Sequence, residues 1–593
     1  MIRKYPIILI LLLAATLRLW GLERGDTIND EVFYAFRAIG LLDFDAAEEQ
    51  ITPLEWHDPS PFADCAALLE ASPADRDQLL EKLPQHCREE RALKNLSAKG
   101  EGVPWWTYLS FHDHPPFVFW VQHLFIKVLG ENPISFRLPS ALLGVASVYL
   151  LYLVGYELFT KRVALISAAI LAVTLNHVFI SRTGMQESYV IFFILLPLLF
   201  FLKALRNDKF FIWLGISLGL GFLAKITVFI LAPILTVYVL LFKREHLLNK
   251  RLWVGVGLAI LLFSPVIIYN LKLYQDVGHF DFQFSYISGQ RPEIWKVAPG
   301  KEVGSLSERL GNFSPRMLAS NSWVFLGLFL GFLLVFLRGL VGNAVKTFHK
   351  YALLIFCLVF IFLLLMLIGP SFRFLAMSTP FLALGVALFL DVVYEKFLLG
   401  RRWLAYTALG LFLLFEVFYS VNNQILYYPY GPSPWFFAKV RYDNYNWGYN
   451  ELEKFLNQEF KGKMPAYTFD LQYKFLEKMQ SRALALARKK GFQPDPFLIT
   501  YGGNIDDGAK LWILERRLVY QGWPMLKLDD YFDFRKKYGE DYFLRSGFKN
   551  FYFILASNTV FPPEVKKTVE GMIFTVLRNQ KGDEIFRIYQ ARY

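Results

Sequence analysis

Residues 29–35, Asn-Asp-Glu-Val-Phe-Tyr-Ala, place two adjacent carboxylates directly after the first apolar run of the chain. That run extends from about Tyr5 to Gly21. It is long for a signal-peptide core and lacks a clean small-residue cleavage site, so we interpret it as an uncleaved membrane helix. Charge beside hydrocarbon is costly and usually marks a site. Asp30 and Glu31 are therefore the first candidate functional residues.

The composition predicts a polytopic membrane protein with at least one polar part. Of 593 residues, 55% are hydrophobic and only 19% are charged, which is too apolar for an ordinary soluble protein. The net charge is +12, but the basic residues stand singly or in small clusters beside apolar runs. Membrane topology explains this pattern better than nucleic-acid binding does, so we expect no nucleic-acid partner. Three cysteines are too few for a disulfide scaffold, and whether Cys65 and Cys87 are bridged stays open.

Further runs of about 20 apolar residues follow, each long enough to cross about 30 Å of hydrocarbon as a helix. With the first run they predict about eleven membrane helices. Residues 117–129 are apolar but short and contain His123 and Lys127, so we expect an interfacial helix there. The acidic stretch 43–99 in the first loop is expected to form short surface helices. The further runs lie near 137–158, 162–180, 188–206, 210–224, 226–243, 252–270, 322–340, 351–369, 372–396 and 403–421.

The distribution of lysine and arginine orients these helices. Basic residues collect at 3–4, 161–162, 206–209, 243–251, 338–350 and 401–402, which are all on one side if the helices alternate. Positive charge marks the cytoplasmic side, so we expect a cytoplasmic N-terminus in the inner (plasma) membrane. The long loops 22–136 and 271–321 then face outside. An odd number of spans leaves everything after about residue 421 outside as well.

The sequence predicts two domains. Residues 1–421 form the membrane domain, which includes the first loop 22–136, and residues 422–593 form a separate extracytoplasmic α/β domain. In the tail the apolar runs shorten to between four and seven residues. Helical patterns at 451–456 and 475–489 alternate with strand-like runs at 497–501, 517–520, 551–555 and 584–589. The Gly502-Gly503-Asn504 sequence lacks the spacing of a phosphate-binding loop and predicts a turn.

Polar residues that do not suit a lipid-facing helix fall at the outer ends of the predicted spans. They could line one external cavity, with carboxylates for proton transfer and cations for a phosphate. This set comprises Asp30, Glu31, His112, Asp113, His114, Arg182, Glu187, Lys225 and Arg373.

Each of these residues also has a purely structural interpretation. Asp30 and Glu31 could begin an interfacial helix, since acids suit a helix N-terminus. The pair His112 and His114 could bind a metal, but two ligands are a weak signal and surface histidines are commoner. Arg182 and Glu187 could form a local salt bridge, and Lys225 and Arg373 could be cations that extend to the membrane surface.

Taken together, the motifs resemble those of the C-type polytopic glycosyltransferases, particularly the branch of protein O-mannosyltransferases and the lipid A aminoarabinose transferase. The resemblance covers roughly residues 1–421. It rests on four features: Asp30-Glu31 with Tyr34-Ala35; His114-Pro115-Pro116-Phe117 leading through Trp120 to Arg137-Leu138-Pro139-Ser140; Ser181-Arg182 with Met185-Gln186-Glu187; and Arg373-Phe374 with Pro380-Phe381-Leu382-Ala383-Leu384.

The resemblance implies a glycosyltransferase whose donor is a sugar on a polyprenyl phosphate and whose acceptor is a lipid, glycan or protein. Asp30 would be the general base on the acceptor hydroxyl, Glu31 would support it, and Glu187 would bind sugar or acceptor. The cations His114, Arg182, Lys225 and Arg373 would contact the lipid phosphate. A single displacement with inversion is expected. No cofactor is implied with certainty, and a divalent metal requirement stays open.

Two other functions remain compatible with the sequence. A flippase for a lipid-linked sugar would have a similar composition, although transporters often show repeated halves and ionisable residues at the membrane midplane. The polar residues here gather at one face, and no internal repeat is visible. An inactive relative that serves as an assembly subunit would look alike in composition.

Overall fold

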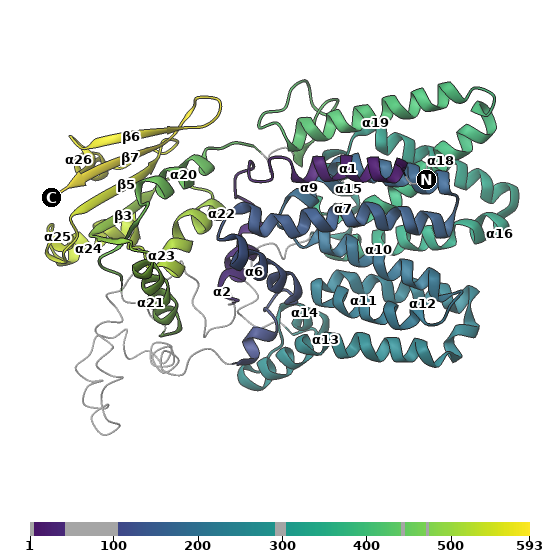
Figure 1. Ribbon diagram of the computed structural model, residues 1–593, viewed down its shortest axis with the longest axis horizontal. Coiled ribbons are helices and arrows are strands. Elements are labelled where there is room, and N and C mark those ends of the chain that lie inside the picture. Colours follow the sequence, from purple (N-terminus) through teal and green to yellow (C-terminus); the bar gives the residue numbers. More distant parts are fainter. Residues whose placement is uncertain (1–4, 42–104, 291–303, 441–444, 470–473) are drawn as a thin grey trace. The chain divides into compact units, whose positions relative to one another are not determined.

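The structure is a computed structural model that describes residues 5–41, 105–290, 304–440, 445–469 and 474–593 (Figure 1). These residues form two compact units. The helical unit contains the described residues up to Gly25 and those from Leu109 to Tyr445. The α/β unit contains residues 26–41, 105–108 and the described residues from Asn446 to Tyr593. The predicted acidic stretch 43–99, with Cys65 and Cys87, lies outside the described residues.

The helical unit has an apolar helix over each predicted membrane run. They are α1 (Tyr5–Leu19), α7 (Pro133–Leu158), α8 (Lys161–Val173) with α9 (Leu175–Arg182), α10 (Glu187–Ala204), α11 (Phe210–Ala224), η5 (Ile226–Ile230) with α12 (Leu231–Phe242), α13 (Lys250–Val277), α16 (Trp323–Ile368), α18 (Thr379–Val393) and α19 (Arg402–Gln424). The helix α16 covers two predicted runs, and non-helical backbone at Asn343 separates its two arms.

Not all of these helices are long enough to cross a membrane. Within the described ranges, six are long and apolar enough to cross a membrane, or up to seven if the bent pair of α8 and α9 counts as one. The helices α1, α11 and the pair η5 and α12 are shorter than 18 residues. The polytopic helical architecture is thus as predicted, while the number of eleven spans stays a prediction.

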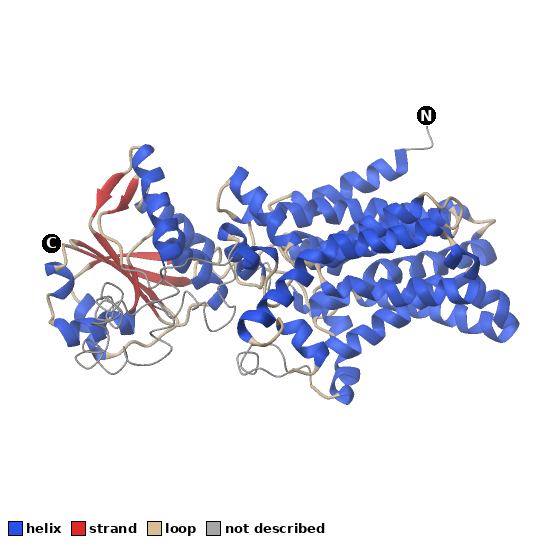
Figure 2. Ribbon diagram, turned by 90° about the horizontal axis from the view of Figure 1, so that it is seen from below, coloured by secondary structure: helices blue, strands red, loops and turns tan. Residues whose placement is uncertain are grey.

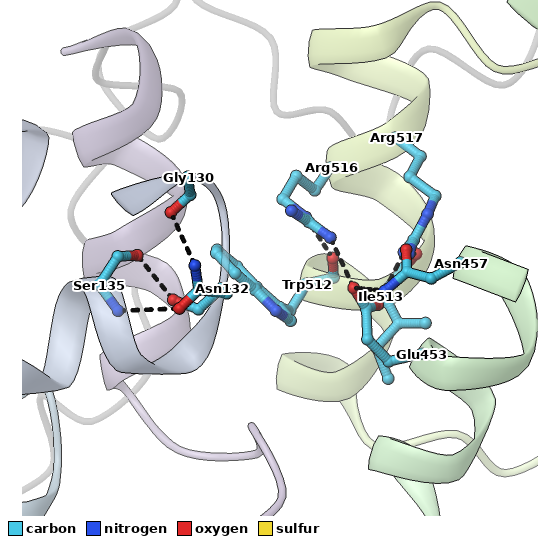
Figure 3. A network of polar contacts seen from close by, with 9 residues as sticks. All are labelled: Gly130, Asn132, Ser135, Glu453, Asn457, Trp512, Ile513, Arg516 and Arg517. Atoms are coloured by element: carbon cyan, nitrogen blue, oxygen red, sulfur yellow. Dashed lines mark hydrogen bonds and ion pairs between the residues drawn. The ribbon is translucent and has the colours of Figure 1, made fainter. Parts of the chain in front are cut away.

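Local sequence signals begin and end these helices. At the start of α7, Asn132 accepts a hydrogen bond from the Ser135 amide at 3.1 Å, and Pro133 fills the first helical position (Figure 3). At the start of α8, Thr160 accepts from the Val163 amide. The predicted interfacial segment is the helix α6 (Phe117–Leu129). Its position at the membrane surface stays a prediction.

Small residues allow the closest helix contacts. The helix α11 packs along α13, and a Cβ atom on Gly215 would stand 2.0 Å from the carbonyl oxygen of Gly255. Because real carbon atoms do not approach so closely, a larger side chain there would separate the two helices. The helix α7 packs against α1, α8 and α10.

The α/β unit is built on a five-stranded mixed sheet in the order β4-β3-β5-β7-β6, flanked by helices (Figure 2). The strands are β3 (Phe497–Gly502), β4 (Met525–Lys527), β5 (Asn550–Ala556), β6 (Ile573–Arg578) and β7 (Glu584–Arg592). The strand β3 is parallel to β4 and β5, and β7 is antiparallel to β5 and β6. A separate parallel pair joins β1 (Lys463–Pro465) and β2 (Gln493–Asp495).

Most predicted elements of the tail are confirmed. The helices α20 (Tyr449–Glu459) and α21 (Lys474–Lys489) and the strands β3, β5 and β7 lie at the predicted positions. The chain bends at Gly503, whose φ of +99° suits glycine, so the predicted turn is confirmed. The strand predicted at 517–520 is wrong, because these residues belong to the helix α23 (Arg516–Gln521).

The division into units also differs from a boundary at residue 421. Residues 26–41 join the α/β unit, and residues up to 445 join the helical unit. The physical reason lies at Asp26, whose buried carboxylate accepts hydrogen bonds from backbone amides at the start of α20.

Candidate functional site

One buried carboxylate and two cations meet in the helical unit. The Lys225 ammonium donates to Glu187 Oε1 at 2.5 Å, and Arg373 Nε lies 3.9 Å from the same oxygen. Glu187 is 1% exposed and Lys225 is 5% exposed. The structure therefore brings together three of the residues that the sequence analysis proposed for the site.

Each member of this cluster stands where a helix begins or ends. Glu187 is the first residue of α10, where the helix dipole favours a negative charge. Lys225 follows the last residue of α11 and has extended backbone. Arg373 lies in the short helix α17 (Phe372–Leu375). The start of α10, the end of α11 and the short helix α17 thus bring three charged side chains together, as the topology predicted.

Phe374 is a member of this site that sequence reasoning did not assign. The Lys225 ammonium lies 4.9 Å from the centre of its ring, and the Arg373 guanidinium lies 5.0 Å from it. The face of an aromatic ring attracts cations, so Phe374 helps to hold both groups. Its position next to Arg373 in the sequence was the available signal.

Polar contacts fix the segment that carries Arg373. The Ser371 side chain accepts from the Phe374 amide at 3.3 Å and starts α17. Asn176 of α9 donates to the Phe372 carbonyl at 3.4 Å, and Arg316 donates to the Pro370 carbonyl at 3.2 Å. These three hydrogen bonds therefore fix the backbone of the segment that carries Arg373.

Two cations lie beside one carboxylate in this cluster. Arg and Lys both donate well to phosphate oxygens. The arrangement can thus bind an anion or stabilise developing negative charge.

Arg182 has a different set of partners. Its guanidinium donates to the carbonyls of Leu17 and Trp20 at 3.0 and 2.8 Å and to that of Gly21 at 2.8 Å. These carbonyls lie at the C-terminal end of α1, where helix carbonyls lack partners in the helix itself. Arg182 therefore caps α1, and a contact between Arg182 and a lipid phosphate stays a prediction.

A second arginine supports the same segment. Arg137 of α7 donates to the carbonyls of Leu22 and Gly25, both at 3.0 Å. Arg137 was one of the motif residues, but its partners could not be inferred from sequence because they are more than a hundred positions away. Arg137 and Arg182 together fix the chain where it leaves α1.

Arg18 and His177 form a buried polar pair that the sequence analysis missed. Arg18 donates to the Ala172 carbonyl at 2.8 Å and lies 2.6 Å from His177 Nδ1. Both side chains are fully buried. The available signal was the arginine itself, because a charge inside the first apolar run needs partners.

The histidine loop before α6 is held by hydrogen bonds to a later segment. His114 Nδ1 lies 2.8 Å from the Asp113 carboxylate. The Phe282 amide donates to the His112 carbonyl at 2.8 Å, and Gln283 donates to the Asp113 carbonyl. Among the described residues no group of three or more His, Cys, Asp or Glu side chains could hold a metal ion. The requirement for a metal stays open.

Asp30 and Glu31 belong to the α/β unit, at the start of α2 (Glu31–Gly40). Asp30 is the residue before the helix, but its side chain makes no capping hydrogen bond. Glu31 is fully buried. Asp30 thus occupies the position before the helix and Glu31 its first turn, and a catalytic role for Asp30 stays a prediction.

The segment around Asp30 is anchored to the α/β unit on both sides. Asp26 accepts from the amides of Trp447, Gly448 and Asn450 at 2.6, 3.0 and 2.9 Å. After Asp30, the Tyr520 hydroxyl donates to the Phe36 carbonyl at 2.7 Å. Both anchors fix the backbone that carries Asp30.

A buried ion network supports the helix that holds Tyr520. Arg516 and Arg517 both contact the Glu453 carboxylate, at 3.0 and 2.8 Å, and Arg517 also donates to Asn457 (Figure 3). Opposite charges lower the pKa of Glu453. These contacts fix the helix 516–521, whose sequence looks like a strand.

Comparisons with known proteins show what this chain is similar to. Residues 113–269 match the family described as dolichyl-phosphate-mannose-protein mannosyltransferase. The matched segment contains His114, Arg182, Glu187 and Lys225. The resemblance to the polytopic glycosyltransferases is confirmed.

Individual relatives show the same partial similarity. YycA of Bacillus subtilis, named as a mannosyltransferase, is 33% identical over 27% of this chain and 23% of its own length. The undecaprenyl phosphate-alpha-4-amino-4-deoxy-L-arabinose arabinosyl transferase of Wigglesworthia glossinidia brevipalpis is 26% identical over 26% of this chain and 29% of its own. The chain thus spans less than a third of the length of either relative.

The fold similarity extends over the whole chain. The apo structure of ArnT from Cupriavidus metallidurans has a TM-score of 0.51 and 13% identity, covering 99% of this chain and 98% of that one. This protein therefore shares the fold of that ArnT structure.

Proposed function

We propose that this protein is an inner-membrane glycosyltransferase that transfers a sugar from a polyprenyl phosphate to a lipid, glycan or protein acceptor at the outer face. The observation that carries the proposal is the cluster in which the buried Glu187 and Lys225 meet the half-buried Arg373. Two of its members lie in the segment that matches the mannosyltransferase family.

The chemistry of the cluster suits the departure of a phosphate from a sugar. When the bond between the anomeric carbon and the phosphate oxygen breaks, negative charge grows on that oxygen. Lys225 and Arg373 would stabilise this charge, and fixed cations do so strongly in a site with little water. Glu187 would keep both cations in place before the donor binds.

Asp30 is proposed as the general base. The acceptor hydroxyl would attack the anomeric carbon from the side opposite the phosphate, so the configuration inverts. A new bond forms between the acceptor oxygen and the anomeric carbon, and the hydroxyl proton passes to the Asp30 carboxylate. Glu31 would support Asp30, and His114 and Arg182 remain proposed phosphate contacts.

The test is transfer of radiolabelled mannose from undecaprenyl phosphate-mannose to acceptors in a membrane extract by the purified protein. We expect Asp30→Asn to insert normally and to lose about a hundredfold or more of the transfer rate, the usual contribution of a general base. Asp507→Asn is the matched control, because Asp507 is exposed in the same unit. Near wild-type transfer by Asp30→Asn would remove Asp30 as the base.

The same assay separates the rival functions. Movement of the labelled lipid across the membrane without a new product would indicate a flippase. Neither movement nor product, with every lipid-phosphate sugar tried, would favour an assembly subunit.

A further inference from the structure

The helix α26 (Pro563–Val569) lies over the sheet of the α/β unit, beside β6 and β7 (Figure 1). Its residues Val565 and Val569 join the apolar cluster of β5. Cavities of about 380 and 390 Å³ lie beside this helix. A third cavity, of about 560 Å³, shares Lys567 with the first and Lys566 with the second. The three cavities therefore adjoin one another and form one groove around α26, the α26 groove.

The register of the sheet brings the side chains that line this groove to one face. Residues two positions apart along a strand point to the same face. Arg587 and Tyr589 of β7 are two apart, and Tyr593 follows in the same phase. Tyr589 pairs with Phe553 of β5 and with Phe574 of β6. All five side chains line the groove.

On one side of α26 the groove combines an exposed ring with a fixed ion pair. Phe574 is 50% exposed, and its ring lies 5.3 Å from that of Tyr589. Arg587 lies 6.0 Å from the centre of the Phe574 ring and donates to Glu584 Oε1 at 2.5 Å. The Ser557 hydroxyl donates to the same oxygen at 3.1 Å. The charged groups next to this ring are thus already oriented.

The other side repeats this arrangement. Tyr593 is 69% exposed, and its ring packs edge-on against that of Phe551 at 5.6 Å. Arg535 lines the same cavity as Tyr593, and its Nε donates to the Glu540 carbonyl at 3.1 Å. The Arg535 guanidinium also lies 5.4 Å from the centre of the Tyr531 ring. Each side of the groove therefore offers an aromatic ring and an arginine whose direction is fixed.

The lining of the groove indicates the class of ligand. Cationic and acidic side chains line it in equal number, which gives no net attraction for a polyanion. The same charges do not suit a lipid chain, which needs apolar walls. Arginine donates and glutamate accepts hydrogen bonds, and an exposed aromatic ring presents a flat apolar face. A sugar ring matches this set, because it carries hydroxyl groups at its edge and C–H groups on its faces.

The position of the groove favours a glycan over a peptide. An extended peptide usually adds to the edge of a sheet, where its backbone pairs with that of the edge strand. The α26 groove lies on the face of the sheet, where β5 and β7 pair with each other and side chains contact the ligand. Two places with an exposed ring and a fixed arginine also indicate a chain of sugars and not a single one.

We propose that the α26 groove binds a glycan, with Phe574 and Tyr593 each against the face of a sugar ring. Arg587 and Arg535 donate to hydroxyl groups of these sugars. The groove lies in the α/β unit and includes no residue of the Glu187 cluster. The inference therefore goes beyond the proposed function and does not rest on it.

The test measures binding of fluorescently labelled hexasaccharides to the full-length protein in lipid nanodiscs by fluorescence anisotropy. The neutral probes are mannohexaose, maltohexaose and N-acetylchitohexaose. Anionic hexagalacturonate and a neutral decapeptide of glycine, serine and tyrosine serve for comparison. We expect the wild type to bind at least one neutral hexasaccharide, and Phe574→Ala and Tyr593→Ala each to lose about tenfold of that affinity.

Tyr467→Ala is the matched control. Tyr467 is 45% exposed in the same unit and lines none of the three cavities. This variant should bind the hexasaccharide as the wild type does. Thermal unfolding of all three variants should stay close to that of the wild type, because each ring that is removed is largely exposed.

The outcomes distinguish this inference from the proposed function. The inference would be overturned if no neutral hexasaccharide binds, if hexagalacturonate or the decapeptide binds more tightly, or if Tyr467→Ala loses as much affinity as the groove variants. Sugar transfer by a wild type that binds no glycan would overturn this inference alone. Glycan binding by a wild type that transfers no sugar would support it and remove the proposed function.

Discussion

At the scale of single residues, Lys225 provides the nearer positive charge to the buried carboxylate of Glu187. Its ammonium is the nearer of the two cations to Glu187, since Arg373 stands 3.9 Å away. Loss of one partner from a buried pair is more costly than loss of both, because it leaves a charge without compensation.

We therefore expect Lys225→Met to destabilise the protein by up to about 3 kcal/mol, less than the full cost of an unpaired buried charge, because Arg373 stays 3.9 Å from Glu187. The double variant Glu187→Gln with Lys225→Met should recover much of this stability, because the uncompensated carboxylate is gone. Both variants should lose transfer. Thermal unfolding and the transfer assay measure the two effects, and a double variant as unstable as Lys225→Met would show that the pair is not coupled.

Glu515 predicts a pH dependence of stability in the α/β unit. It is 1% exposed and accepts from the Tyr501 hydroxyl at 3.3 Å. Burial raises the pKa of Glu515 to about 7. The folded state therefore holds this proton more tightly than the unfolded state. The stability from Glu515 is full below its ordinary pKa of 4.5 and is lost as the pH rises from there to about 7.

Glu515→Gln should remove this dependence, since glutamine has a similar shape and carries no charge. The free energies of unfolding of the variant and the wild type, measured by thermal unfolding, should be similar near pH 4.5. By about pH 8 the free energy of unfolding of the variant should be higher by up to about 3 kcal/mol. The exposed Glu564→Gln is the control and should follow the wild type. A constant difference across the pH range would contradict the prediction.

At the scale of elements, the start of α20 depends on Asp26. Its carboxylate accepts from the backbone amides that begin this helix, which have no partners inside the helix. Asp26 lies four positions before Asp30, so the same contact fixes the segment of the proposed base.

We expect Asp26→Ala to cost about 1–2 kcal/mol of stability, as loss of a helix cap does. We also expect a fall in the transfer rate at saturating donor with little change in donor affinity, because Asp30 itself remains. Asp506→Ala is a matched control, since Asp506 caps the short helix α22 (Asp507–Lys510) through the amides of Gly508 and Ala509. An equal fall in both variants would attribute the effect to general instability.

How far the sequence predicts these elements depends on their length and partners. Long apolar runs identify the helices of the helical unit, because few structures other than a helix can cross a membrane. The runs at β3, β5 and β7 were predicted as strands, whereas the run 517–520 is helical because it continues the helical stretch that begins at Asp507 and ends at Gly522. The three-residue strand β4 is too short to show a periodic pattern.

The candidate site was predictable to a similar degree. Topology and resemblance predicted that Glu187, Lys225 and Arg373 lie together, and the structure brings them together. Charge alone could not show that Arg182 bonds to the carbonyls at the end of α1, because backbone acceptors have no sequence signature.

At the scale of the whole molecule, the charge distribution predicts which side of the membrane each part faces. Cysteine labelling tests it in a variant without the native cysteines. A cysteine at Val341, 90% exposed between the arms of α16, should react only after the membrane is permeabilised. A cysteine at Val560, 89% exposed in the α/β unit, should react in intact spheroplasts. The opposite pattern would reverse the proposed orientation and the proposed outer-face reaction.

The contact between Asp26 and the start of α20 has a consequence for synthesis. The two partners are 421 positions apart in the chain. At about 5–20 residues per second, the segment with Asp30 waits some tens of seconds on the ribosome before its partners are made. Every apolar helix between them has been synthesised by then. The segment of the proposed base therefore acquires this contact only after about three quarters of the chain has been made.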